Sequence, residues 1–158
     1  LFIWGKQYYL SFQPNSQKNG FEIKGDKVIL SMREESTVKQ RENYVREQYR
    51  ILLKAEIERL LPKWERLTEL YCDSWQTKYM LTRWGTCNTE KKKLWFNLQL
   101  AQKPIECLEY VILHELLHLK ERTHNSVFIS CMDLYMKDWR AVRKELNDLR
   151  LDYYNKVE

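Results

Sequence analysis

Apolar and polar residues alternate in short runs at the start of the chain. These runs are rich in aromatic and β-branched side chains, and glycine-containing turns at Asn19-Gly20 and Gly25-Asp26 separate them. Alternation between such turns is typical of strands. We therefore expect a small antiparallel sheet, with strands at Gln7–Phe12, Phe21–Ile23 and Lys27–Leu30.

A long stretch with helical spacing follows. Its apolar residues recur every three or four positions, and Thr37 with Gln40 three residues later forms a capping-box pattern. This pattern predicts an amphipathic helix over Val38–Leu61. Pro62 predicts the end of that helix, and Lys63–Tyr71 a shorter helix with the proline in its first turn.

The second half of the chain predicts two paired strands and three helices. The strands are Lys78–Leu81 and Leu94–Leu100, and the first helix starts at Pro104, where proline suits a helix start. Two further helices cover Ser126–Met136 and Trp139–Leu149. Strands, a long helix, strands and then helices predict an α+β fold rather than a doubly wound parallel sheet.

The composition fits one domain over residues 1–158, with a β-rich part at residues 1–35. Six Trp, ten Tyr and five Phe cannot all remain solvated, which excludes a disordered chain. No uninterrupted apolar run approaches the ~18–20 residues of a membrane span, so we expect no membrane partner.

The net charge and the cysteine content exclude fewer classes of protein than the aromatic content and the apolar runs do. The net charge of +5 and pI near 9.0 permit an acidic partner such as nucleic acid, but positive and negative residues are interleaved. The longest run of like charge, Lys91–Lys93, fits a solvated hairpin tip better than a phosphate contact. The four cysteines include no C-x-x-C pair, and residues 1–10 do not resemble a signal peptide. We expect free thiols and a cytoplasmic location.

All three histidines of the chain lie within eleven residues, in and just after the helix that starts at Pro104. His114 and His118 belong to an H-E-x-x-H motif, and His124 follows six residues later. On a helix, positions i and i+4 share one face, so two imidazoles can bind one ion. With His124 as third ligand, a fourth position stays open, as in catalytic zinc sites. Glu115 can reach a metal-bound water without being a ligand. We expect one Zn²⁺ per chain.

Other candidate ligands and site residues have structural alternatives. Glu121, Asp133 and Glu145 are rival third ligands, and Cys87 is a fourth candidate as a thiolate. Arg83 is a candidate for oxyanion stabilisation or for tying a loop to a carboxylate. Tyr110, one turn before His114, is a candidate for orienting a ligand or donating to the transition state, with packing in the core as the structural alternative. Asn97 binds substrate backbone or pins a turn.

These residues resemble a known family of enzymes. The matching positions are Arg83-Trp84-Gly85-Thr86-Cys87, Asn97 within Leu94–Leu100, Pro104, Tyr110-Val111, His114–Leu119, His124 and Phe128. They resemble the YgjP-like metallopeptidases, which are grouped with the SprT-like zincins. The chain departs from the family pattern at Thr86, where the family has serine, and at Ile129, where it has tryptophan. The resemblance is strongest over residues 78–149, which we expect to form the catalytic core.

The resemblance implies a zincin-like domain, a Zn²⁺ held by three histidines and Glu115 as the catalytic carboxylate. We therefore expect a zinc metallopeptidase that hydrolyses peptides or proteins, with substrate added as a strand along Leu94–Leu100. Two alternatives stay open. One is a SprT-like protease that acts near nucleic acid, and the other is a catalytically silent, metal-stabilised interaction module.

Overall fold

The N-terminal residues form two small sheets. In the computed structural model, which describes residues 1–148, β1 (Phe2–Ile3) pairs with β2 (Lys6–Gln7), and a second sheet has the order β3-β5-β4. Strand β5 (Lys27–Met32) is antiparallel to β4 (Gly20–Lys24) but parallel to β3 (Tyr9–Pro14), so the expectation of an antiparallel sheet is wrong. The β4 to β5 turn is two residues long, with Gly25 at a φ of 59°. Because β5 pairs between β3 and β4, the sheet is mixed.

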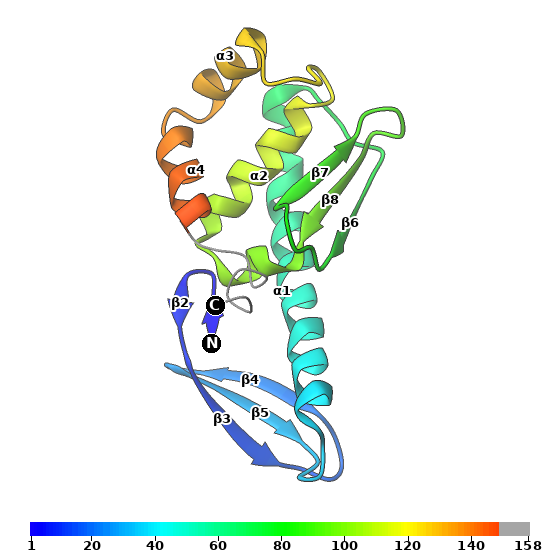
Figure 1. Ribbon diagram of the computed structural model, residues 1–158, viewed down its shortest axis with the longest axis vertical. Coiled ribbons are helices and arrows are strands. Elements are labelled where there is room, and N and C mark those ends of the chain that lie inside the picture. The colour runs from blue at the N-terminus through cyan, green and yellow to red at the C-terminus, as the bar shows by residue number, and fades with distance from the viewer. Residues whose placement is uncertain (149–158) are drawn as a thin grey trace.

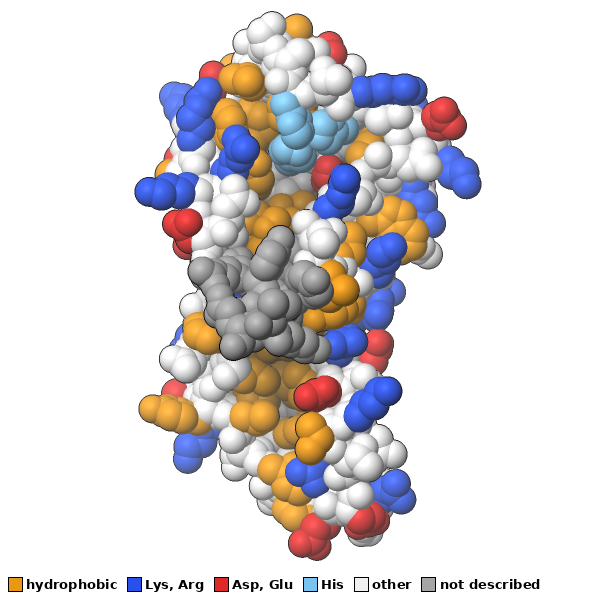
Figure 2. Space-filling view, in the orientation of Figure 1, with side chains coloured by type: hydrophobic (Ala, Val, Ile, Leu, Met, Phe, Trp, Pro, Cys, Tyr) orange, Lys and Arg blue, Asp and Glu red, His pale blue; other side chains and the backbone are white. Residues whose placement is uncertain are grey.

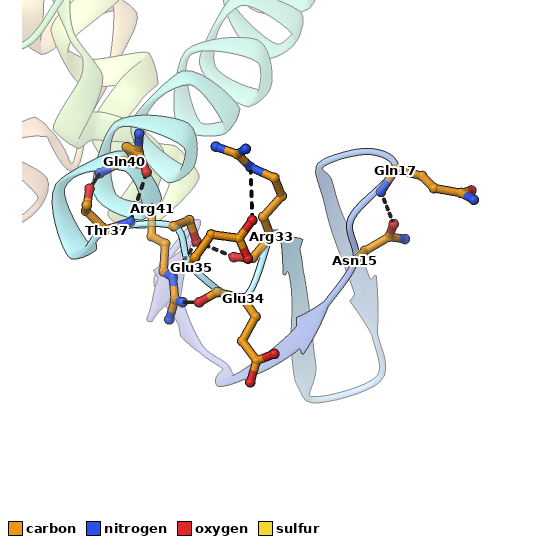
Figure 3. A network of polar contacts seen from close by, with 9 residues as sticks. Asn15, Gln17, Arg33, Glu34, Glu35, Thr37, Gln40 and Arg41 are labelled. Atoms are coloured by element: carbon orange, nitrogen blue, oxygen red, sulfur yellow. Dashed lines mark hydrogen bonds and ion pairs between the residues drawn. The ribbon is translucent and has the colours of Figure 1, made fainter.

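Helix α1 (Val38–Thr68) begins at the predicted capping box. The Thr37 hydroxyl accepts from the Gln40 backbone N–H at 3.1 Å, and the Gln40 side chain accepts from the Thr37 N–H at 2.9 Å. In addition, Arg41 donates to the Glu34 carbonyl at 3.0 Å (Figure 3). The two capping-box bonds satisfy backbone N–H groups that a helix start leaves unpaired, and the Arg41 bond ties the first turn of α1 to the preceding loop.

The predicted break at Pro62 is wrong, because α1 continues through the proline to Thr68. The whole helix has 31 residues and is about 46 Å long. A proline inside a helix costs about 3 kcal/mol, because it removes one hydrogen bond and crowds the preceding turn. Leu60 and Leu61 before it and Trp64 after it are all buried. Burial of their apolar surface on both sides of the proline exceeds that cost.

The third sheet has the order β6-β8-β7. Strand β6 (Ser74–Lys78) lies earlier than the predicted Lys78–Leu81, and β8 (Lys93–Asn97) is shorter than the predicted Leu94–Leu100, which continues as the 3₁₀ helix η1 (Leu98–Gln102). As predicted, these two strands pair, in parallel. Strand β7 (Gly85–Asn88) was not predicted and pairs antiparallel to β8. Because β8 lies between two strands, it has no free edge for an added strand, and that expectation is corrected.

Three helices complete the described chain: α2 (Ile105–Leu117), α3 (Ser126–Tyr135) and α4 (Trp139–Asp148). Leu149, the last residue of the predicted helix, lies outside the described residues. Helix α2 lies between the β6-β8-β7 sheet and α4, and α1 runs from the β3-β5-β4 sheet to the far end of the molecule (Figure 1). Buried side chains of α1, β8, η1 and α2 form one core cluster, which confirms the α+β fold. No helix among residues 1–148 is long and apolar enough to span a membrane.

Candidate metal centre and cleft

Helix α2 carries the H-E-x-x-H motif on its last turns, against the core. Nine of its thirteen residues are buried, including Leu113, Leu116 and Leu117 around the motif. Glu115 is 5% exposed and is the only buried Asp, Glu, Lys or Arg among residues 1–148. A carboxyl group at such a position is costly to bury unless it has a function or a partner.

The three histidine side chains converge on one point. His118 ends α2, and the chain turns back so that His124 lies against both motif histidines. The Nε2 atom of His124 lies 3.1 Å from Nε2 of His114 and 3.1 Å from Nε2 of His118, and the last two are 3.2 Å apart. Ligands of a tetrahedral zinc ion at 2.0–2.1 Å lie about 3.3–3.4 Å apart. The triangle is therefore the size of one face of such a site.

On two of the three rings, a hydrogen-bond partner at Nδ1 leaves Nε2 free to bind a cation. Nδ1 of His118 lies 3.0 Å from the Glu121 carbonyl oxygen, which can only accept, so Nδ1 carries the proton and Nε2 a lone pair. The Tyr110 hydroxyl lies 3.4 Å from Nδ1 of His114, where it can accept in the same way. The Phe128 ring packs against all three imidazoles, with centroids 4.9–5.1 Å away.

Burial shifts the ionisation of the groups in this site. It lowers the pKa of His114 to about 3 and the pKa of His118 in the same direction, so both rings are kept neutral, the form that binds metal. It raises the pKa of Glu115 to about 8, against the opposing charge of Arg83. Strongly shifted groups gathered in one cleft are typical of a functional site.

The histidines and Glu115 line a cleft of about 460 Å³. Its walls are α2, strand β7 with the residues before it, the loop after α2, and α4. In Figure 2 the histidines lie in a hollow with Lys or Arg side chains on both sides. Arg83 and Tyr110, two of the predicted site residues, line this cleft as well.

Gly85 allows β7 to approach the motif. A β-carbon on Gly85 would lie 2.8 Å from Cγ1 of Val111 and 3.2 Å from Cγ of Glu115, closer than such atoms pack. The absence of a side chain at this position therefore sets the distance between β7 and α2. Sequence reasoning included Gly85 only among the positions that match the family pattern and missed this contact.

Asn97 lies at the end of β8, fully buried, and is not among the residues that line the cleft. Its carboxamide donates to the carbonyl oxygens of Met80 at 3.0 Å and Arg83 at 2.7 Å, and accepts from the N–H groups of Met80 and Gln99. These are the contacts of a residue that pins a turn, and they hold the segment that carries Arg83 into β7.

The rival ligands lie outside the histidine triangle. Among residues 1–148 the grouping of metal-ligating atoms consists of the three histidines alone. The Glu121 carboxylate accepts from Asn125, and the Asp133 carboxylate from Trp139 and Arg140. Cys87 lines the cleft, and burial raises the pKa of its thiol to about 11. Neither Cys87 nor Glu145 joins the grouping.

Two further arginines line the cleft that sequence reasoning did not single out. Arg122 lies in the loop between α2 and α3, two residues before His124. Arg143 lies on α4, next to the buried Val142. The sequence carries only a weak signal for these two residues. Arg122 lies two residues before the candidate ligand His124, and Arg143 lies beside the apolar stripe of a predicted helix.

Comparisons with known proteins agree with this geometry. No curated protein matches the chain. Among solved structures, the chain is similar to the crystal structure of the metallopeptidase zymogen of Methanocaldococcus jannaschii jannalysin. The TM-score is 0.51 at 18% identity, over 58% of this chain and 94% of that one. This likeness shows a shared zincin-like fold. The model of the family described as "YgjP-like, metallopeptidase domain" matches residues 1–149, so the chain belongs to the YgjP-like metallopeptidase domain family.

Proposed function

We propose that the protein is a zinc-dependent peptidase whose ion is held by His114, His118 and His124. The observation that carries the proposal is the triangle of three Nε2 atoms 3.1–3.2 Å apart, with the buried Glu115 beside it in the same cleft. Three imidazoles suit zinc, and three protein ligands leave a fourth position for water or substrate. Zinc in such a site supplies Lewis-acid chemistry, polarising the scissile carbonyl and making water more acidic.

Glu115 is proposed as the general base. It follows His114 directly on α2 and lines the cleft, yet it is not one of the three converging ligands. A carboxyl group with a raised pKa exchanges protons readily near neutral pH, and a nearby cation lowers that pKa again. Glu115 would take the proton of the attacking water and deliver it to the departing amine.

Strand β7 is proposed to hold the substrate. It pairs with β8 on one side only, and residues from Gly85 to Cys87 line the cleft beside Glu115. An extended peptide can add to such an edge through backbone hydrogen bonds, which do not depend on the side chains of the peptide. Arg83 and Tyr110 face the same cleft. We propose that Arg83 stabilises the negative charge that develops on the carbonyl oxygen, and that Tyr110 does the same or holds His114 in place.

The decisive experiment combines metal analysis with a protease assay. The purified chain should contain about one zinc ion and cleave casein or a quenched peptide library, and a chelator should abolish cleavage until zinc is restored. The metal-stabilised interaction module becomes the better explanation if the wild-type protein holds its zinc firmly and cleaves nothing.

A further inference from the structure

Three arginines line the cleft that contains the histidine triangle, each on a different wall. Arg83 comes from the segment before β7, Arg122 from the loop after α2, and Arg143 from α4. All three are exposed, and none has an ion-pair partner among residues 1–148. Within the described residues 1–148, Glu115 is the only acidic residue that lines the cleft.

Outside the cleft, Arg33, Arg50, Arg59 and Arg140 each lie within 4.0 Å of a carboxylate, whereas Arg41, Arg46 and Arg66 have no ion-pair partner among residues 1–148. Acidic and basic residues are interleaved along the chain, so the net charge of +5 is not concentrated by sequence. The cleft differs in that three arginines without ion-pair partners line it together, which makes it a local region of positive charge. Cleft walls of low dielectric strengthen such a field, and a bound divalent ion would add to it.

We propose that the cleft selects peptides that carry a carboxylate close to the scissile bond. This inference rests on the proposed peptidase function and adds the class of substrate. A guanidinium presents a planar fork of N–H donors that matches a carboxylate in two parallel hydrogen bonds. The carboxylate can belong to an Asp or Glu side chain near the cleaved bond or to the end of the peptide chain.

The first experiment compares matched peptides with the zinc-loaded wild-type protein. One set differs only in Glu, Gln or Lys next to the cleaved bond, and a second set has a free or an amidated C-terminus. At low salt we expect kcat/KM to be at least fivefold higher for a carboxylate-bearing peptide than for its neutral match. The ratio should fall towards one at about 1 M salt, where the screening length is only about 3 Å. The two sets show whether the cleft recognises a side-chain carboxylate or the C-terminal carboxylate of the peptide.

Variants of the arginines test where the preference arises. Arg122→Gln and Arg143→Gln should each reduce the Glu-over-Gln ratio about two- to fivefold, the range of an exposed ion pair. The double variant Arg122→Glu with Arg143→Glu should turn the preference towards the Lys peptide. Lys144→Glu is the matched control: it makes the same change of charge on α4, next to Arg143, at an exposed residue that does not line the cleft.

A binding measurement separates this inference from the proposed function. Zinc-loaded Glu115→Gln is titrated with the same labelled peptides, and the Glu peptide should bind more tightly than the Gln peptide. Binding with this preference but without any hydrolysis by the wild type would contradict the peptidase and support the selective cleft. Hydrolysis without any preference among the peptides would support the peptidase and overturn the selective cleft. Equal loss of preference in Lys144→Glu would also overturn it.

Discussion

Gly85 and Glu115 lie against each other where strand β7 meets helix α2. A β-carbon at position 85 would approach Cγ of Glu115 to 3.2 Å, the Trp95 carbonyl oxygen to 3.1 Å and Cγ1 of Val111 to 2.8 Å. None of these neighbours is the free end of a flexible side chain. The position of the proposed base therefore depends on a residue that has no side chain.

Gly85→Ala should destabilise the protein by about 1–3 kcal/mol, because β7 must move away from α2 to make room for the methyl group. It should also reduce kcat/KM, because the strand and Glu115 separate. Gly20→Ala is the control, since its β-carbon would meet only Ser31 at 3.4 Å. Urea unfolding and peptide cleavage of both variants provide the measurement. Equal stability of the two variants would show that the junction is not tight.

Asn97→Ala should cost about 2–4 kcal/mol, because it leaves several buried backbone groups without partners. The Arg83 carbonyl oxygen, 2.7 Å from the Asn97 amide nitrogen, is one of them. The variant should keep its zinc, because the histidines lie on a separate segment. Asn88→Ala, which breaks similar bonds on an exposed turn, should cost less than 1 kcal/mol. An Asn97→Ala protein of normal stability and impaired substrate binding would instead favour a role in binding.

Removing a histidine of the triangle should release the metal. We expect His118→Ala and His124→Ala to lose most of their zinc, and their melting temperatures to become insensitive to a chelator that lowers that of the wild type. Glu121→Gln, which changes a rival ligand and keeps the backbone carbonyl that holds His118, should retain zinc. Zinc content by elemental analysis decides the result. Full retention by His124→Ala would remove that residue from the ligand set.

Glu115→Gln should separate metal binding from catalysis. The variant should hold zinc as the wild type does, because the proposed ligands are the three histidines. Hydrolysis should fall by about 10²–10⁴, the usual contribution of a general base. Single-turnover cleavage of a fluorogenic peptide, with zinc measured in the same samples, tests this. Cleavage at the wild-type rate would assign the base elsewhere.

The same substitution should change the pH dependence of the metal-free protein. The pKa of Glu115 is about 8 in the folded chain against an ordinary value of 4.5, so between these values the folded state binds more protons than the unfolded state. The stabilisation of the folded state by protonated Glu115 is therefore fully present below about pH 4.5 and is lost as the pH rises through about 8. The melting temperature of Glu115→Gln should rise relative to that of the wild type between pH 5 and pH 8.5. Glu90→Gln, at an exposed carboxylate, is the control, and parallel curves for the wild type and Glu115→Gln would contradict the shift.

The order of most elements and the convergence of the three histidines were predictable because their signals are local. The apolar stripe of α2 and the spacing of His114, His118 and His124 lie within one short stretch of sequence. The capping box at Thr37 likewise involves residues three positions apart. Patterns of this kind need no knowledge of what packs against them.

The elements that were missed depend on contacts between distant segments. Strand β7 is four residues of Gly-Thr-Cys-Asn without apolar alternation, and it exists because it pairs with β8 and packs on α2. Helix α1 continues through Pro62 because residues on both sides of the proline, such as Leu61 and Trp64, are buried in the core. Arg143 reaches the cleft because α4 packs against α2. The helix and strand propensities of the residues and the periodicity of the apolar positions do not show which distant segments pack together.

The three converging nitrogens come from eleven consecutive residues, so little chain entropy is lost in bringing them together. Closing so short a loop costs little, and each doubling of loop length would add only about 0.6 kcal/mol. The rest of the cleft is built from segments remote in the chain, β7 and α4, which must be docked on α2. A partly unfolded chain that has released β7 or α4 would thus keep the three proposed ligands together while the rest of the cleft is lost. We therefore expect denaturant to abolish peptide cleavage, the proposed activity, before it releases zinc.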